Sequence, residues 1–110
     1  MDEAVRLAQG VVQKNPNIPG FVDTLGWVYY KKGLYGAAVE QLKKAVALDE
    51  RAARSGNGTP AANYQYHLGM ALKARGDKDA AKRALEQAVR LSDKTPFAEA
   101  EEARSVLAAL

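Results

Sequence analysis

The residues of this sequence that could carry out chemistry are few and stand apart from one another. His67 is the only histidine among 110 residues, and there is no cysteine. A metal site needs several ligating side chains at suitable spacing, and a catalytic nucleophile needs a neighbouring base. His67 has neither in a recognisable motif, so we interpret it as a surface or inter-helix residue. The sequence therefore predicts no catalytic residue, no metal site, no cofactor and no enzymatic activity.

Two short segments match binding or modification motifs only formally. Gly56-Asn57-Gly58 is rich in glycine, but it is too short for a phosphate-binding loop and no Lys-Ser/Thr follows it. Asn57-Gly58-Thr59 fits the N-glycosylation triplet, but Pro60 directly after it argues against its use. We therefore expect neither a nucleotide site nor a glycan in this part of the chain.

The charge of the chain is mildly positive and dispersed. Sixteen Lys and Arg residues stand against thirteen Asp and Glu residues, for a formal net charge of +3. The main basic stretch, from Lys73 to Arg90, is interleaved with acidic residues, which is typical of a solvated helix face. Phosphate backbones require a denser basic stripe, so the sequence predicts no nucleic-acid partner. No apolar run approaches the roughly 20 residues that span a bilayer, so we expect no direct membrane insertion.

Helix signals dominate the chain and place these residues on helices. Alanine, the best helix former, contributes much of the 47% hydrophobic share, and the alternating pattern of strands is lacking. Prolines and glycines mark the boundaries, because proline suits the first helical turn and glycine the residue after a helix. The expected helices span residues 2–14, 19–32, 35–53, about 59–75, 78–92 and about 96–109. The sequence therefore predicts an all-α protein of about six helices.

A set of small and large residues occurs twice at one fixed spacing. Each member recurs 43 residues later: Leu25, Gly26, Gly33, Ala38, Leu42 and Ala45 reappear as Leu68, Gly69, Gly76, Ala81, Leu85 and Ala88. Glycines inside the helices let a paired helix cross closely, alanines face them, and leucines fill the space between helices. Such internal repetition predicts a repeat array, which stacks its units to bury a core and presents an extended binding surface.

These residues resemble the tetratricopeptide repeat, whose pattern is W-x2-L-G-x2-Y, then A-x3-F, then P. The two units read Val22-x2-Leu25-Gly26-x2-Tyr29 then Ala38-x3-Leu42, and Gln65-x2-Leu68-Gly69-x2-Leu72 then Ala81-x3-Leu85. The resemblance implies one domain over residues 1–110, a right-handed α-solenoid of antiparallel helix hairpins. Its expected parts are a half repeat at 1–16, a repeat at 19–53, an insertion loop at 54–61, a repeat at 62–95 and a C-terminal capping helix at 96–110.

Two departures from the family pattern affect packing. The position of the family's tryptophan is occupied by Val22 in the first repeat and by Gln65 in the second. These smaller side chains are expected to make fewer contacts between repeats. The spacing is 43 residues rather than 34, so about nine residues are inserted around 50–61. We expect a longer second helix plus a glycine-rich loop, with Thr59 and Pro60 opening the next helix. The insertion is interpreted either as a tolerated surface segment or as a contact for a partner.

The resemblance also implies a concave groove, lined by the first helix of each repeat, that holds a peptide or a partner's helix. The matching positions predict eight partner-binding residues: Asp23, Trp27, Tyr30, Lys31, Asn63, Tyr66, Met70 and Lys73. The aromatic residues would be large anchors and Met70 an adaptable surface. The alternative for Trp27 and Tyr66 is packing between adjacent helices. Asp23 argues against a clamp for a C-terminal carboxylate, because like charges repel.

The function implied by the resemblance is a non-catalytic scaffold for protein–protein interaction, with a protein or peptide as partner. The alternative is a structural segment of a longer array, or a homo-oligomer formed through an uncovered N-terminal face with Ala4, Ala8, Val11 and Val12. The segment from Asp23 to Tyr30 is also similar to bacterial repeat proteins of surface-polysaccharide and exosortase-associated systems, which indicates a bacterial setting.

Overall fold

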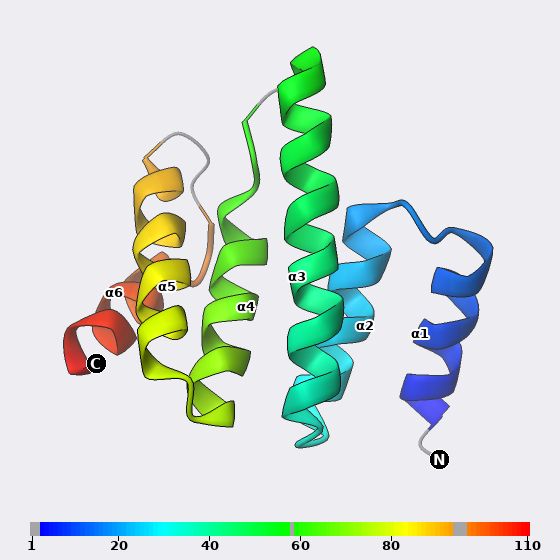
Figure 1. Ribbon diagram of the computed structural model, residues 1–110, viewed down its shortest axis with the longest axis horizontal. Helices are drawn as coiled ribbons and strands as arrows, with labels where there is room; N and C mark the ends of the chain where they lie inside the picture. Colours follow the sequence, from blue (N-terminus) through cyan, green and yellow to red (C-terminus); the bar gives the residue numbers. More distant parts are fainter. Residues whose placement is uncertain (1–2, 58, 94–96) are drawn as a thin grey trace.

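Helices that alternate in direction form a row of hairpins (Figure 1). The computed structural model describes residues 3–57, 59–93 and 97–110. Its α-helices are α1 (Glu3–Lys14), α2 (Pro19–Lys31), α3 (Tyr35–Ala52), α4 (Ala62–Arg75), α5 (Lys78–Ser92) and α6 (Ala100–Ala109). Each helix contacts the next along the chain, and α2 also contacts α4. Over the described residues, the predicted all-α solenoid of helical hairpins with about six helices is confirmed.

The helix boundaries agree with the sequence patterns except at the starts of α4 and α6. The first residues of α2, α3 and α5 are the predicted ones, and their last residues lie within one position of the prediction. α4 begins at Ala62, so the prediction that Thr59 and Pro60 open it is wrong. α6 begins at Ala100 rather than near 96, and residues 94–96, between the two expected helices and at the start of the second, lie outside the described residues.

A glycine follows the first helix of each repeat and reverses the chain. The backbone angle φ is 81° at Gly33 and 96° at Gly76, in the left-handed region that glycine adopts without the steric cost of a Cβ. In both turns the next amide donates to the carbonyl five residues earlier, at 2.9 Å. Asp77 then occupies the N-cap position of α5, although its side chain makes no capping hydrogen bond. These turns bring α3 against α2 and α5 against α4.

The insertion continues α3 before the chain turns toward α4. Residues 53–57 continue directly from α3 as a helical turn that is kinked at Gly56, where φ is 94°. α3 itself has 18 residues, whereas its counterpart α5 has 15. The predicted longer second helix is therefore confirmed, and the segment expected to be a loop at 54–61 begins as a helical turn.

An acidic side chain of α3 holds the segment that leads into α4. The Ala61 amide donates a hydrogen bond to Oδ2 of Asp49 at 2.7 Å. Ala61 has extended backbone at the N-cap position of α4, and its methyl group cannot cap the helix. A carboxylate near a helix N-terminus is also favoured by the helix dipole. Asp49 thus holds the start of α4 from another helix, in place of the predicted Thr59.

Asp49→Ala is expected to lower the free energy of unfolding by about 1 kcal/mol, because a lost helix cap costs roughly that much. Asp49→Asn keeps an oxygen acceptor and should cost less. The measurements are urea unfolding and hydrogen exchange of the Ala61 amide. Unchanged exchange of this amide in the alanine variant would show that Asp49 does not hold the segment.

Two buried leucines fill the hairpins at the points where their helices cross. Leu42 and Leu85 are fully buried. A Cβ built on Gly26 would lie 2.6 Å from Cγ of Leu42, and one built on Gly69 would lie 2.7 Å from Cγ of Leu85. Because Gly26 and Gly69 have no side chain, α2 can approach α3 and α4 can approach α5. The close crossing that the repeated glycines predict is therefore confirmed.

Candidate functional site

The residues predicted to bind a partner come from two neighbouring helices that run in the same direction. α2 and α4 are in contact, and they are parallel because one antiparallel helix, α3, separates them along the chain (Figure 1). The surface they form, called here the α2/α4 face, carries Asp23, Trp27, Tyr30, Lys31, Asn63, Tyr66, Met70 and Lys73. The structure thus brings the predicted residues of α2 and those of α4 side by side. The burial of each side chain decides whether a partner could reach it.

Trp27 is the centre of an aromatic cluster on the α2/α4 face. Its ring stacks on Tyr30 with the centroids 4.5 Å apart and on His67 with the centroids 4.0 Å apart. Its centroid also lies 6.2 Å from that of Tyr66. Aromatic pairs at these distances attract each other beyond the area that they bury. Trp27 therefore packs between α2 and α4, which is the alternative interpretation given for it above. Its side chain remains half-buried.

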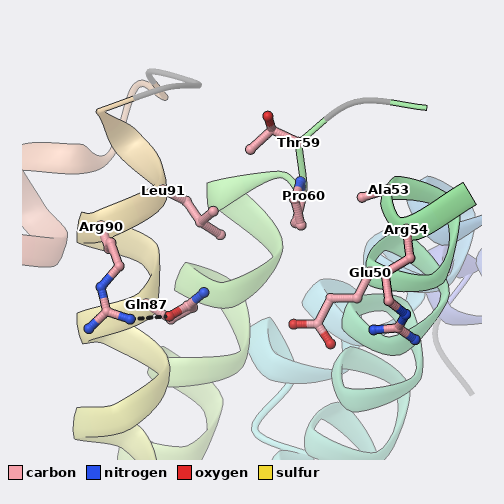
Figure 2. A pocket seen from close by; sticks show the side chains of 8 residues that line it. All are labelled: Glu50, Ala53, Arg54, Thr59, Pro60, Gln87, Arg90 and Leu91. Atoms are coloured by element: carbon pink, nitrogen blue, oxygen red, sulfur yellow. Dashed lines mark hydrogen bonds between the residues drawn. The ribbon is translucent and has the colours of Figure 1, made fainter. Parts of the chain in front are cut away.

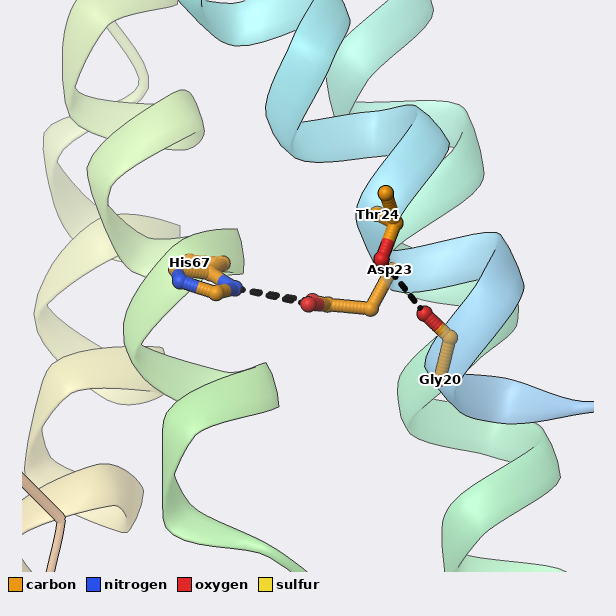
Figure 3. A network of polar contacts seen from close by, with 4 residues as sticks. All are labelled: Gly20, Asp23, Thr24 and His67. Atoms are coloured by element: carbon orange, nitrogen blue, oxygen red, sulfur yellow. Dashed lines mark hydrogen bonds and ion pairs between the residues drawn. The ribbon is translucent and has the colours of Figure 1, made fainter. Parts of the chain in front are cut away.

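A buried polar contact joins the same two helices (Figure 3). Both carboxylate oxygens of Asp23 lie 2.9 Å from Nδ1 of His67. The Asp23 side chain is 8% exposed and the His67 side chain 12% exposed. Because an ionised carboxylate only accepts hydrogen bonds, His67 donates its Nδ1–H. Thr24, on the next position of α2, instead donates its hydroxyl to the Gly20 carbonyl at 2.9 Å.

This contact corrects the role that the sequence assigns to Asp23. The family positions predict Asp23 as a partner contact, but the structure buries it and pairs it with His67. Its carboxylate therefore does not face an incoming ligand, and the argument that it repels a C-terminal carboxylate no longer holds. His67 is an inter-helix residue, one of the two roles expected for it. Nothing in the sequence pattern points to its partner, which lies 44 residues away.

Tyr66 is covered by the C-terminal part of the chain. It is 3% exposed, its ring centroid lies 5.8 Å from that of Phe97, and it packs in one cluster with Ala103 of α6. The charge of Glu102 lies near its hydroxyl. Burial above all, together with the charge of Glu102, raises the pKa of Tyr66, so the phenol stays protonated. The prediction of Tyr66 as an accessible anchor is corrected, because the structure places it beneath α6.

An aromatic strip and two cations remain at the surface of the α2/α4 face. Trp27, Tyr30 and Met70 are half-buried, whereas Lys31 and Lys73 are exposed. Each lysine lies in the last turn of its helix, so both stand at the same end of the face. Asn63, in the first turn of α4, is half-buried at the opposite end. The face therefore offers apolar contact area with positive charge at one end.

A second, polar cleft lies between α3, α5 and the segment before α4 (Figure 2). It has a volume of about 560 Å³ and is lined by Glu50, Ala53, Arg54, Thr59, Pro60, Gln87, Arg90 and Leu91. The Glu50 side chain extends from α3 toward α5, and Arg90 donates to Gln87 at 3.0 Å. Acidic and basic side chains both line the cleft, so it favours no single ligand charge. Several of its residues belong to the insertion, the part of the chain for which a partner contact is one interpretation.

Among residues 3–57, 59–93 and 97–110, no three His, Cys, Asp or Glu side chains gather as metal ligands. Likewise, none of the helices that the structure describes combines the length and apolar character needed to cross a membrane.

The pairing of helices into repeated hairpins points to a known family. The family model for the tetratricopeptide repeat matches residues 23–94, which is more than half of the chain. The chain belongs to the tetratricopeptide repeat family. Tetratricopeptide repeats generally mediate protein–protein interactions and generally act as non-catalytic scaffolds. A search of the curated proteins found no match.

Two contacts of this tetratricopeptide repeat domain escape sequence reasoning. The ring of Tyr35 lies 5.7 Å from that of Tyr30, and the charge of Glu102 lies near the hydroxyl of Tyr66. Tyr35 does leave a signal, because it stands just past the glycine turn, where the chain returns alongside the end of α2. Glu102 leaves none, since its place depends on how α6 packs rather than on any local pattern.

Proposed function

We propose that this tetratricopeptide repeat domain is a non-catalytic scaffold that binds a helix or an extended segment of a partner protein along the α2/α4 face. The observation that supports this most is the strip of Trp27, Tyr30 and Met70, half-buried across two helices. Rigid aromatic rings and an adaptable methionine provide contact area of the kind enriched in binding hot spots. No cofactor takes part.

The two exposed lysines give the bound segment a direction. Lys31 and Lys73 lie at the C-terminal ends of α2 and α4, where the helix dipoles also favour cations. Acidic residues of the partner pair with these lysines while its apolar residues cover the aromatic strip. Exposed ion pairs add little affinity but influence register and the rate of association. Asn63 supplies amide hydrogen-bonding groups at the other end of the face.

Asp23 and Tyr66 contribute to this function from beneath the surface. Asp23 fixes His67, on which the Trp27 ring stacks. The Tyr66 ring lies beside the same indole, with the two centroids 6.2 Å apart, and it packs in one cluster with Ala103 of α6. Both therefore position the aromatic strip without contacting the partner.

The test compares two charge reversals of equal size. Lys31→Glu/Lys73→Glu alters the α2/α4 face, whereas Lys43→Glu/Lys82→Glu alters exposed lysines of α3 and α5. Each variant captures proteins from a bacterial lysate, and the captured proteins are quantified. We expect the first variant to lose a specific protein about tenfold relative to wild type, because an acidic face repels an acidic segment, and the second variant to retain it.

Equal capture by the two variants would place the interaction elsewhere, for example at the cleft of Figure 2. Tyr30→Ser then examines the aromatic part separately, since it removes a half-buried ring and leaves Trp27 in place. Helical circular dichroism confirms that each variant is folded. A domain that is only a structural segment of a longer array would show no specific capture through this face.

A bacterial surface-polysaccharide or exosortase-associated setting is part of the same proposal. Its support is the similarity of the segment from Asp23 to Tyr30 to repeat proteins of such systems. Components of polysaccharide export or protein sorting among the captured proteins would favour this setting, and capture of unrelated proteins alone would count against it.

A further inference from the structure

An apolar surface lies open beside the first helix. It is formed by Ala4, Leu7, Ala8 and Val11 of α1 together with Phe21, Thr24 and Val28 of α2, and is called here the N-terminal face. Leu7 is 63% exposed, Val11 42% and Phe21 39%. Large apolar side chains gathered in one exposed cleft mark a site of interaction. Val12, expected from the sequence to belong to this surface, instead lines another one with Leu25.

The internal repeat shows what kind of element fits the N-terminal face. Ala4, Ala8 and Val11 occupy the same repeat positions in α1 as Ala38, Leu42 and Ala45 in α3, 34 residues later. The three residues of α3 are fully buried, and Leu42 lies against Gly26 of α2. Among the described residues, no helix lies along α1 in the place that α2 takes beside α3. The element that fits this place is therefore an α-helix along α1.

We propose that a second copy of this chain covers the N-terminal face, with the two α1 helices antiparallel about a two-fold axis between residues 7 and 8. In that register Ala4 of one copy faces Val11 of the other, and Leu7 faces Ala8. Each large side chain thus meets a small one, which lets two helices pack closely. The same surface serves both copies, as a two-fold interface requires.

The charges of α1 favour the same orientation. Its first turn carries Glu3 and its last turn Lys14. Antiparallel helices bring Glu3 of one copy within one turn of Lys14 of the other, and they also align the helix dipoles favourably. Parallel helices would bring like charges together instead. Glu3 already pairs with Arg6 of its own helix at 2.8 Å, which keeps the carboxylate at this end of the face.

The C-terminal helix is a poor match for the N-terminal face. The side of α6 away from the core exposes Glu101, Glu102, Arg104 and Ser105. Burying these polar side chains against Leu7 and Phe21 would cost free energy without returning hydrogen bonds. A head-to-tail chain of copies is therefore disfavoured relative to a closed pair. This inference concerns another surface than the α2/α4 face and does not depend on the function proposed for that face.

The first experiment measures the mass of the purified 110-residue chain by light scattering over a concentration series. We expect a monomer–dimer equilibrium whose dissociation constant rises by about 100-fold in Leu7→Glu, because the charge would be buried twice in each dimer. Leu34→Glu is the matched control, since Leu34 is 48% exposed outside the N-terminal face. It should dimerise as wild type does, and circular dichroism shows that both variants fold.

Wild-type protein that stays monomeric across the series overturns the proposal. Dimerisation that survives Leu7→Glu, or that Leu34→Glu abolishes equally, also overturns it.

The orientation is tested by cross-linking, for which the absence of native cysteine is convenient. Near the proposed axis, the two copies of Ala8→Cys are offset by one residue along the helices, about 1.5 Å. The two copies of Ala4→Cys are offset by about 10 Å at 1.5 Å per residue, too far for a disulfide. We expect oxidation to link Ala8→Cys and not Ala4→Cys. Linking both equally, as in a parallel pair, or neither, would overturn the proposed geometry.

Discussion

Gly26→Ala is expected to lower the free energy of unfolding by about 2 kcal/mol, although alanine is the better helix former. The added Cβ would lie 2.6 Å from Cγ and 3.2 Å from the backbone nitrogen of Leu42. Leu42 is fully buried, so its side chain has no free volume to enter. The cost of overpacking therefore exceeds the roughly 1 kcal/mol gained in helix propensity. Gly69→Ala, against Leu85, should behave in the same way.

Gly10 and Gly36 are the matched controls for this prediction. Both lie inside helices, and a Cβ built on either meets no atom within 4 Å. Alanine at these positions is expected to raise the free energy of unfolding by about 0.5–1 kcal/mol. Thermal and urea unfolding of the four variants provide the comparison. An increase in stability in all four would show that the crossing at Gly26 tolerates a side chain.

A double variant separates the crowding from other effects of the glycine substitution. Leu42→Ala removes the atoms that the new Cβ would meet, at the cost of a cavity. In the Leu42→Ala background, Gly26→Ala should therefore lose its destabilising effect. A substitution that costs the same in both backgrounds would assign the loss to something other than this contact.

His67→Ala is expected to lower the free energy of unfolding by about 3 kcal/mol, the scale on which a buried pair loses one partner. The Asp23 carboxylate, whose side chain is 8% exposed, would lose the Nδ1–H donor that now lies 2.9 Å away. The variant also removes the ring on which Trp27 stacks. Both losses fall on the contact between α2 and α4. Urea unfolding at neutral pH measures the change.

Two further variants test whether the loss comes from the polar pair. Asp23→Asn keeps an oxygen that accepts from His67, and it is expected to cost about 1 kcal/mol. Asp23→Leu/His67→Leu removes both polar groups together and should be more stable than His67→Ala, because no buried charge is left. If His67→Ala costs no more than Asp23→Asn, the unpaired carboxylate is not the source of the loss.

The fold could be predicted from the sequence because its signals are local and occur twice. The glycines and leucines spaced 43 residues apart mark the same crossing in both hairpins, and the glycine turns end α2 and α4 where the pattern indicates. The start of α4 could not be predicted in this way. The side chain that holds it, Asp49, comes from α3, and a local capping rule applied to Thr59 cannot detect it.

The α2/α4 face was predictable in its position and less so in its exposure. Repeat positions identify which residues of α2 and α4 stand beside one another, and the structure brings Trp27, Tyr30 and Met70 to one surface. Burial depends on contacts between distant segments. Asp23 is buried by its contact with His67, which lies 44 residues away in the sequence, and Tyr66 is buried by α6. A family position therefore indicates where a residue lies, and its neighbours decide whether a partner can reach it.

Trp27 is the only tryptophan of the chain, and its ring lies between Tyr30 and His67 where the two repeats meet. Intrinsic fluorescence excited at the indole therefore comes from this one place. Its emission wavelength and its quenching by the stacked rings will change when one repeat moves against the other. The protein thus carries a built-in optical reporter at the junction of its repeats, which records their relative movement without any added label.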